Sequence, residues 1–462
     1  MTNIWNSSQD IDKATGGICS ISHGELEISD KNTFREKLAD ELAWNAVFNT
    51  NEKLRDMAMW LIWEGSLCLG CPSASIHDLY MERVHNEYEF VTVPAINIRG
   101  MTYDIARTVF RTMKKSNCGA AILEIARSEI VYTKQRPAEY ASTVLAAAIK
   151  EGYEGPVFIQ GDHFQVNAKK YAANPREEID NLKKLIEEAV KAGFYNIDID
   201  SSTIVDLSKA TVLDQQRANF ETCAELTGYI RKLEPQGVTV SVGGEIGEVG
   251  GRNSTEEELT AFMEGYNAAL GTSKNRIAGI SKISIQTGTS HGGVPLPDGS
   301  IAKVKLDFDV LDQLGQVARE QFHIGGVVQH GASTLPEDAF NHFPKRQTLE
   351  VHLATGYQNI IYDSKNFPKE LLDEIYAWLG KNCASERKSG DTDEQFYYKT
   401  RKKGFGPFKE KLWSLPETVK NVLMAELAKT FDLHFKKLNV VGSKKLISKY
   451  IKPTLVHKHF VS

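Results

Sequence analysis

A chain of 462 residues is too long for one small domain and needs either a large domain with additions or several domains. Hydrophobic residues make up 41% of it and charged residues 25%, the balance of an ordinary soluble globular protein. The net charge of −5 argues against a dedicated nucleic-acid-binding protein, which would carry a strongly basic face. No apolar stretch approaches the roughly 20 residues that span a bilayer, and the N-terminus has no signal-peptide pattern. We therefore expect a cytoplasmic protein without nucleic-acid or membrane partners.

Residues 1–90 are predicted to form a mainly helical N-terminal addition. Between residues 32 and 64, apolar side chains such as Leu38, Leu42 and Leu61 recur at helical spacing. Cys68 and Cys71 form a C-x-x-C pair, but a metal site of that kind needs a second pair, which the six cysteines do not supply. We expect both to be ordinary helix or loop residues.

From residue 91 onward, short β-rich runs alternate with longer amphipathic segments. Strands separated by helices indicate βαβ units and a parallel sheet. Eight such runs within residues 91–365 favour a (β/α)₈ TIM barrel, an α/β fold, over an open doubly wound sheet. The predicted strands are TVPAINI (92–98), AAILEIA (120–126), VFIQGDH (157–163), NIDID (196–200), VTVSVGGEI (238–246), KISIQTG (282–288), IGGVVQHG (324–331) and NIIYD (359–363).

The clearest intervening helix is predicted over residues 177–194, and Gly193 is its expected stop. One face of this helix carries Ile179, Leu182, Leu185, Ile186 and Val190. Beyond residue 365 the strand pattern ends and charged helical sequence follows. We therefore expect residues 366–462 to form a helical C-terminal appendage, which includes a basic run at 399–411.

Polar residues end most of the predicted strands, and in a (β/α)₈ barrel the active site lies at these carboxyl ends. They are Asn97, Asp162 with His163, Asp200, Glu245, His291, His330 and Asn359. Three histidines from three different strand ends would meet on one rim of the barrel. Three imidazoles with one open position form a known catalytic zinc geometry. The sequence therefore predicts a zinc site of His163, His291 and His330.

Six motifs carry a family resemblance. The segments QGDHFQ, IDIDSS, GGEIGEVGG, QTGTSHGGVP followed by KLDFDVL, QHGAST and YQNIIYD resemble, in the same order, those of class II, zinc-dependent ketose-bisphosphate aldolases. This group includes fructose- and tagatose-bisphosphate aldolases. The resemblance covers roughly residues 91–365 and implies a carbon–carbon lyase of carbohydrate metabolism and glycolysis.

The resemblance also implies roles for individual residues. His163, His291 and His330 match the zinc ligands, Asp162 matches the general acid/base, and Glu245 matches a glutamate near the metal. Asp200 matches an aspartate that shapes the site, and Asn97 is a further expected substrate contact. The positions that match binding of phosphate and hydroxyls in the dihydroxyacetone phosphate half are Gly292, Gly331, Ser333 and Asn359.

The implied cofactor is one Zn²⁺ per subunit, with room for a monovalent cation. The implied partner is a sugar phosphate, and the subunits are expected to form a homo-oligomer. For the distal phosphate of a bisphosphate we expect a contact from Arg401 or a neighbouring lysine, because related aldolases use a basic residue from this region. Arg99, Arg127 and Lys305 are the other cations near the motifs.

One loop departs from the family pattern. Arg252 and Asn253 stand after the glycines, where the family usually has acidic residues. One of those acidic residues takes part in proton exchange on the dihydroxyacetone carbon. Glu248, Glu256 or Glu257 could substitute from the same loop. The departure keeps two alternatives open, a metal-dependent keto-sugar epimerase on the same scaffold and a non-catalytic aldolase partner subunit. Retention of the three histidines and Asp162 argues against the second alternative.

Overall fold

The computed structural model describes residues 3–247, 252–271, 277–288, 296 and 306–459. Eight parallel strands form a closed barrel, in which each strand pairs with the next along the chain and the last pairs with the first. The predicted (β/α)₈ fold is therefore confirmed. The strands are β4 (Val93–Asn97), β5 (Ile122–Ala126), β6 (Val157–Gln165), β7 (Asn196–Asp200), β8 (Ser241–Glu245), β9 (Lys282–Ile285), β10 (Val327–Gln329) and β11 (Glu350–Leu353).

Helices follow the strands and surround the barrel. They are α6 (Thr102–Ser116), α7 (Arg127–Tyr132), α8 (Pro137–Lys150), α9 (Ala168–Ala173), α10 (Pro175–Ala192), α11 (Val212–Leu233), α12 (Glu256–Leu270), α14 (Phe308–Glu320), α15 (His342–Lys345) and α16 (Thr355–Tyr362). Helix α10 is the one predicted over residues 177–194. Its predicted apolar face is buried, and Gly193 ends it in the left-handed conformation, with φ of 100°.

The prediction of the eighth strand at residues 359–363 is wrong. Residues 359–362 form the end of α16 and Asp363 caps that helix, whereas the strand that closes the barrel is β11, which begins at Glu350. In β11 the polar Glu350 and His352 alternate with Val351 and Leu353, and all four are buried. The sequence gives no sign that the polar face of this strand points into the barrel, so its pattern resembles that of a surface segment.

The N-terminal addition contains a hairpin as well as helices. Its elements are α1 (Ser8–Thr15), β1 (Cys19–Ser22), β2 (Glu25–Ile28), α2 (Lys31–Thr33) with a π-helical turn at Phe34–Leu38, α3 (Ala39–Phe48), α4 (Glu52–Cys68), β3 (Ser73–Ala74) and α5 (His77–Val84). The predicted helical stretch at 32–64 is thus divided among α2 with its π-helical turn, α3 and α4. Strand β3 pairs with β6, and Cys68 and Cys71 are free thiols.

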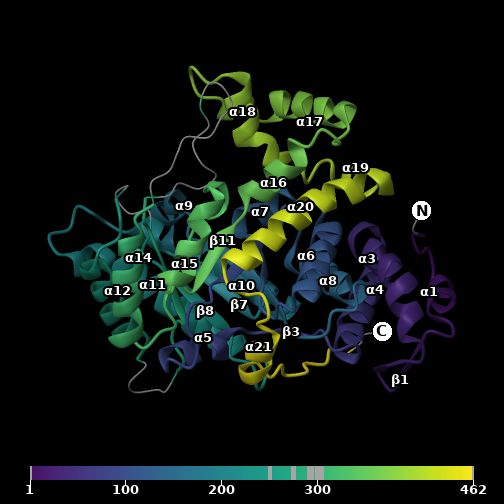
Figure 1. The fold of residues 1–462 in the computed structure, drawn as a ribbon, viewed down its shortest axis with the longest axis horizontal. Helices are drawn as coiled ribbons and strands as arrows, with labels where there is room; N and C mark the ends of the chain where they lie inside the picture. The colour runs from purple at the N-terminus through teal and green to yellow at the C-terminus, as the bar shows by residue number, and fades with distance from the viewer. Residues whose placement is uncertain (1–2, 248–251, 272–276, 289–295, 297–305, 460–462) are drawn as a thin grey trace.

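The segment after the barrel is helical, with α17 (Lys369–Asn382), α18 (Asp393–Thr400), α19 (Lys409–Trp413), α20 (Glu417–Lys437) and α21 (Lys444–Tyr450). Figure 1 shows α17 and α18 projecting beyond the barrel on the side of α7 and α9, while α5 and α21 lie at the opposite end. The exact divisions at residues 90 and 365 stay predictions. No helix among the described residues is both long and apolar enough to cross a membrane.

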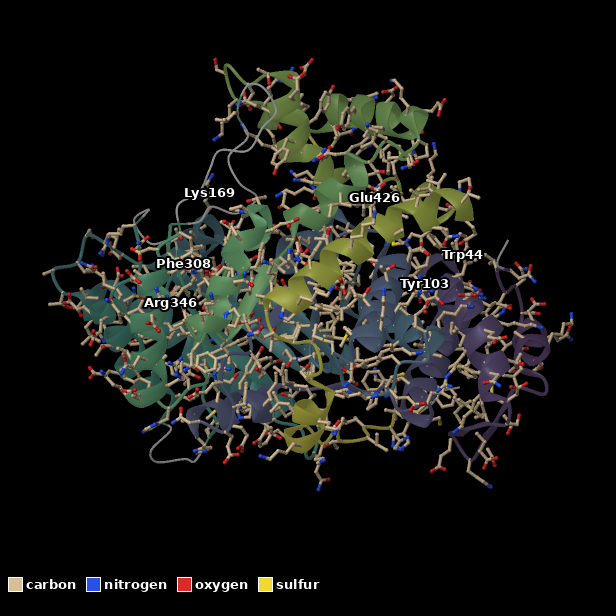
Figure 2. All side chains as sticks on the ribbon, viewed as in Figure 1. Trp44, Tyr103, Lys169, Phe308, Arg346 and Glu426 are labelled. Carbon is tan, nitrogen blue, oxygen red and sulfur yellow. The ribbon has the colours of Figure 1, made fainter. Side chains whose placement is uncertain are left out.

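Aromatic side chains join the two additions to the barrel. The ring of Trp413 in α19 lies 6.2 Å from Trp44 of α3 and 6.0 Å from Tyr103 of α6, between ring centroids. Figure 2 shows Trp44 and Tyr103 in the same region, beside the N-terminal helices. Farther along, the indole nitrogens of Trp60 and Trp63 donate to the carbonyl oxygens of Lys458 and Val456, so α4 also holds the C-terminal segment.

Candidate active site

A cavity of about 450 Å³ opens at the carboxyl ends of β4, β5, β6, β10 and β11. This is the rim at which (β/α)₈ enzymes carry their active sites. Eight of the residues predicted to be functional or near the motifs line it: Asn97, Arg99, Arg127, Asp162, His163, His330, Gly331 and Ser333. The predicted rim is therefore a real concave site.

A β-bulge in β6 turns two consecutive residues toward this cavity. From Gly161 to Phe164, three steps along β6 face only two steps along β7, so β6 carries one extra residue. His163 takes a positive φ of 41°, which few residues other than glycine adopt. In a regular strand Asp162 and His163 would point to opposite faces. The bulge allows both side chains to line the same cavity.

His163 lies between carboxylates on one side and His330 on the other. Its Nδ1 is 3.2 Å from an oxygen of Asp200 and 3.2 Å from one of Glu245, and its ring centroid is 4.2 Å from that of His330. Burial lowers the pKa of His163, but Asp162, Glu245 and Asp200 outweigh burial and raise it well above its ordinary value. Asp200 and Glu245 therefore contact the imidazole of His163 at Nδ1.

The donor atoms of Asp162, His163 and His330 fit a divalent cation. One ligand atom from each lies within 4.8 Å of the others. With Nδ1 of His163 facing carboxylates, its Nε2 faces the Asp162 side, at 3.8 Å from Oδ1. A histidine that binds a metal through one ring nitrogen commonly donates a hydrogen bond from the other ring N–H to a carboxylate, which fixes the orientation of the ring. His291 and Gly292 lie outside the described residues.

His352 is a site residue that the sequence analysis missed. It projects from β11 into the cavity, its ring stacks on His330 at 4.0 Å between centroids, and its Nδ1 is 3.3 Å from Asp162 Oδ1. Nearby, burial and Asp162 raise the pKa of Glu124 to about 7, although His352 opposes them. Correct placement of the eighth strand at Glu350–Leu353 would have put His352 at the rim.

The model of the class-II fructose-bisphosphate aldolase family matches residues 84–402 of the chain. The chain belongs to this family. It is therefore a class II aldolase, a carbon–carbon lyase of a metal-dependent family, and the aldolase interpretation of the motifs is confirmed. No curated protein matches the chain.

Several solved structures are similar to this aldolase. A Sinorhizobium meliloti protein named as a probable tagatose 6-phosphate kinase is 14% identical, with a TM-score of 0.53 over 78% of this chain and 99% of that one. Fructose-bisphosphate aldolase from Campylobacter jejuni is 17% identical, with a TM-score of 0.48 over 81% and 97%. The YdjI aldolase of Escherichia coli K12 is 12% identical, with a TM-score of 0.46 over 80% and 99%. At 14% identity the likeness to the Sinorhizobium meliloti protein concerns the fold alone.

The predicted phosphate-binding residues of the aldolase separate into two groups. Gly331 is left-handed, with φ of 68°, and it lines the cavity together with Ser333, whose hydroxyl accepts from the N–H of Gly356. Asn359 instead lies on α16, where its amide donates to the hydroxyl of Tyr398, and it is not among the residues that line the cavity. Asn97 lines the cavity and donates to Glu129 at 2.6 Å.

Arg401 is not among the residues that line the cavity. It is 4% exposed, forms a bidentate ion pair with Asp363, and donates to Asn359 at 2.7 Å. The next residue, Lys402, does line the cavity, and no carboxylate in the described part of the chain lies within 4 Å of its ammonium group. Burial, followed by the charge of Arg99, lowers the pKa of Lys402.

Two residues that depart from the family pattern, Arg252 and Asn253, make polar contacts with acidic side chains. Arg252 pairs with Glu258 at 2.7 Å, and the amide of Asn253 donates to Asp307 at 3.2 Å. Glu256 and Glu257 start α12 and line a separate surface depression, away from His163. Glu248, the third suggested substitute, lies outside the described residues.

Proposed function

We propose that the enzyme is a zinc-dependent aldolase that reversibly cleaves a ketose bisphosphate, fructose or tagatose 1,6-bisphosphate, to dihydroxyacetone phosphate and glyceraldehyde 3-phosphate. The observation that carries this proposal is the β6 bulge, because it brings a carboxylate and an imidazole from adjacent residues into one cavity. In a metal-dependent aldolase, C–C cleavage uses a Lewis acid at the ketone oxygen and a proton acceptor at the hydroxyl that becomes the aldehyde, so metal-binding and proton-accepting groups must lie in one cavity.

His163 and His330 would hold the cation, and we assign His291 as the third imidazole. The donor set suits zinc, which imidazole nitrogen binds well. A divalent cation bound here supplies Lewis-acid stabilisation of the negative charge that develops at the ketone oxygen. Glu245 and Asp200 keep the ring of His163 oriented through Nδ1.

Asp162 performs the proton transfer in this proposal. It is 5% exposed and lines the cavity beside the histidines. Its carboxylate takes the proton of the hydroxyl on the carbon that becomes the aldehyde, and it returns that proton in the condensation direction. Glu124 and His352, next to Asp162, are within 3.0 Å of one another and close the inner side of the site.

The charge of the cavity suits a substrate with two phosphates. Gly331 and Ser333 offer a backbone N–H and a hydroxyl to the phosphate of the dihydroxyacetone half. Four cations line the same cavity: Arg99, Arg127, Lys170 and Lys402. We assign the distal phosphate to the basic segment at 401–402, in which Arg401 anchors the chain through Asp363 and Lys402 presents the ammonium group.

Triose-phosphate release tests this function. The purified chain is stripped with a chelator, reloaded with Zn²⁺, and incubated with fructose 1,6-bisphosphate, tagatose 1,6-bisphosphate or fructose 1-phosphate, with product measured by a coupled dehydrogenase. We expect zinc-restored release from at least one bisphosphate at a higher kcat/KM than from the monophosphate. Release that is unaffected by chelation would contradict zinc dependence, and no release from either bisphosphate would contradict the assigned reaction.

A further inference from the structure

A buried network of charged side chains fills part of the barrel interior, where (β/α)₈ barrels usually carry branched apolar residues. The ammonium of Lys282 on β9 lies 2.8 Å from Gln160 of β6, 3.0 Å from Asp198 of β7 and 2.6 Å from Glu350 of β11. Because β9 is adjacent to neither β6 nor β11 in the sheet, these contacts cross the interior. At the amino end of β11, the hydroxyl of Tyr80 on α5 donates a hydrogen bond to Glu350.

His352 connects this interior network to the active site. Its Nε2 is 2.7 Å from Glu350, and its Nδ1 is 3.0 Å from Glu124 and 3.3 Å from Asp162. Its ring lies nearly parallel to that of His330, at 17° between the planes. Both nitrogens therefore face carboxylates, and the flat face of the ring covers His330. His352 thus touches the proposed acid/base and a proposed metal ligand at once.

We infer that His352 is a positioning residue that fixes the carboxylate of Asp162 and the ring of His330, and that the Glu350–Lys282 pair holds His352 in place. A free carboxylate rotates among several orientations, and an imidazole turns about its χ angles. Contacts on both groups from one buried ring remove these freedoms before substrate arrives. The ring itself is fixed because Glu350, the residue that pairs with it from the interior, is also held by Lys282 and Tyr80.

His352 is assigned to positioning and not to zinc ligation, since its two nitrogens already lie close to Glu124, Asp162 and Glu350. Burying several charges is costly unless each is paired, so a network like this one has few alternative arrangements. That property makes it a rigid support for the rim. The inference rests on the proposed function only in treating Asp162 and His330 as working residues.

The experiment substitutes His352→Gln, which keeps a polar side chain but removes the ring. Zinc affinity is measured without substrate, by competition with a chromogenic chelator, and kcat and KM are measured on the preferred ketose bisphosphate. We expect zinc affinity and kcat each to fall by about 10- to 100-fold. KM should change by less than about threefold, because His352 acts through its neighbours and not through the substrate.

The matched control is His434→Gln. His434 is also a buried histidine, 5% exposed, and it pairs with the hydroxyl of Tyr357 outside the cavity. This control should lose stability while zinc affinity and kcat stay within about twofold of the parent values. Thermal unfolding of each variant, followed by circular dichroism, separates loss of fold from loss of positioning.

A second variant, Glu350→Gln, keeps the ring and weakens its anchor, so it tests the inference even if His352→Gln does not fold. It should lower zinc affinity and change the visible absorption of the Co²⁺-loaded protein. Unchanged zinc affinity in the folded variants overturns the inference, as does a higher KM with an unchanged kcat. If no ketose phosphate is cleaved by the parent protein, zinc affinity and the cobalt spectrum still decide whether His352 positions the site.

Discussion

Replacement of Lys282 by methionine tests how much the buried ammonium group of Lys282 contributes to the free energy of unfolding. Lys282 is 1% exposed, and its ammonium lies within 3.2 Å of both Asp198 and Glu350. Methionine has a similar length but no charge, so both carboxylates lose this cation. Removing one partner of a buried ion pair costs about 3–5 kcal/mol, and we expect that loss of unfolding free energy at pH 8. Lys282→Met/Glu350→Gln should recover part of it by neutralising one carboxylate.

The loss should depend on pH. Burial raises the pKa of Asp198 and of Glu350, and Lys282 lowers both, so that the pKa of Glu350 lies below its ordinary value in the parent protein. Without Lys282 these folded-state pKa values rise. A carboxyl whose folded pKa exceeds its unfolded pKa destabilises the protein increasingly as the pH rises above the unfolded pKa, and fully above the folded pKa. The deficit of Lys282→Met should therefore shrink as the pH falls from 8 to 5.

Urea denaturation at the two pH values, at constant salt, measures these quantities. The control is Lys436→Met, because Lys436 pairs with Asp432 on the exposed side of α20, where such a pair contributes about 0–1 kcal/mol. A loss below about 1 kcal/mol for Lys282→Met at pH 8 would refute the reasoning, since it would equal that of a surface pair. An equal loss of unfolding free energy at pH 5 and pH 8 would show that the ionised carboxylates of Asp198 and Glu350 are not its cause.

Three further outcomes are expected. Asp162→Asn should retain zinc while kcat falls by about 10²- to 10⁴-fold, and loss of the metal in this variant would make Asp162 a ligand. Lys402→Met should raise KM for a bisphosphate by about 10- to 100-fold more than for a monophosphate, and equal effects on both would remove Lys402 from the phosphate site. Burial lowers the pKa of His434 to about 4. Unfolding therefore takes up a proton as the pH falls from about 6.5 to 4, and the protein should lose about 3 kcal/mol over this range, a loss that urea titrations should not find in His434→Gln.

Local patterns in the sequence were sufficient for most of the barrel. The strands of a parallel barrel are buried by helices on one side and by the interior on the other, so they appear as short apolar runs between amphipathic segments. Seven of the eight predicted runs overlap a barrel strand, and the rim residues Asp162, His163 and His330 follow from where those runs end. Motif order within the same runs also identified the aldolase family.

The eighth strand escaped this reasoning because its environment comes from distant residues. Glu350 and His352 alternate with apolar residues and resemble a half-exposed strand, while the apolar run at 359–363 belongs to a helix. Only contacts with Lys282 and Tyr80, which lie 68 and 270 positions away along the chain, make the polar face of β11 an interior one. A charge that is neutralised across a barrel leaves no trace in local hydrophobic periodicity.

The sequence by itself therefore determined the fold class, the family and the residue types at the rim, since these depend on short-range patterns and motif order. Tertiary structure alone decided which of those side chains face the same space. The register in which β6 pairs with β7 creates the bulge that directs the side chains of Asp162 and His163 toward the same cavity. Packing of the segment after α18 places Arg401 against Asp363 and leaves Lys402 at the cavity. Both outcomes depend on strand register and on partners far along the chain, which adjacent residues do not encode.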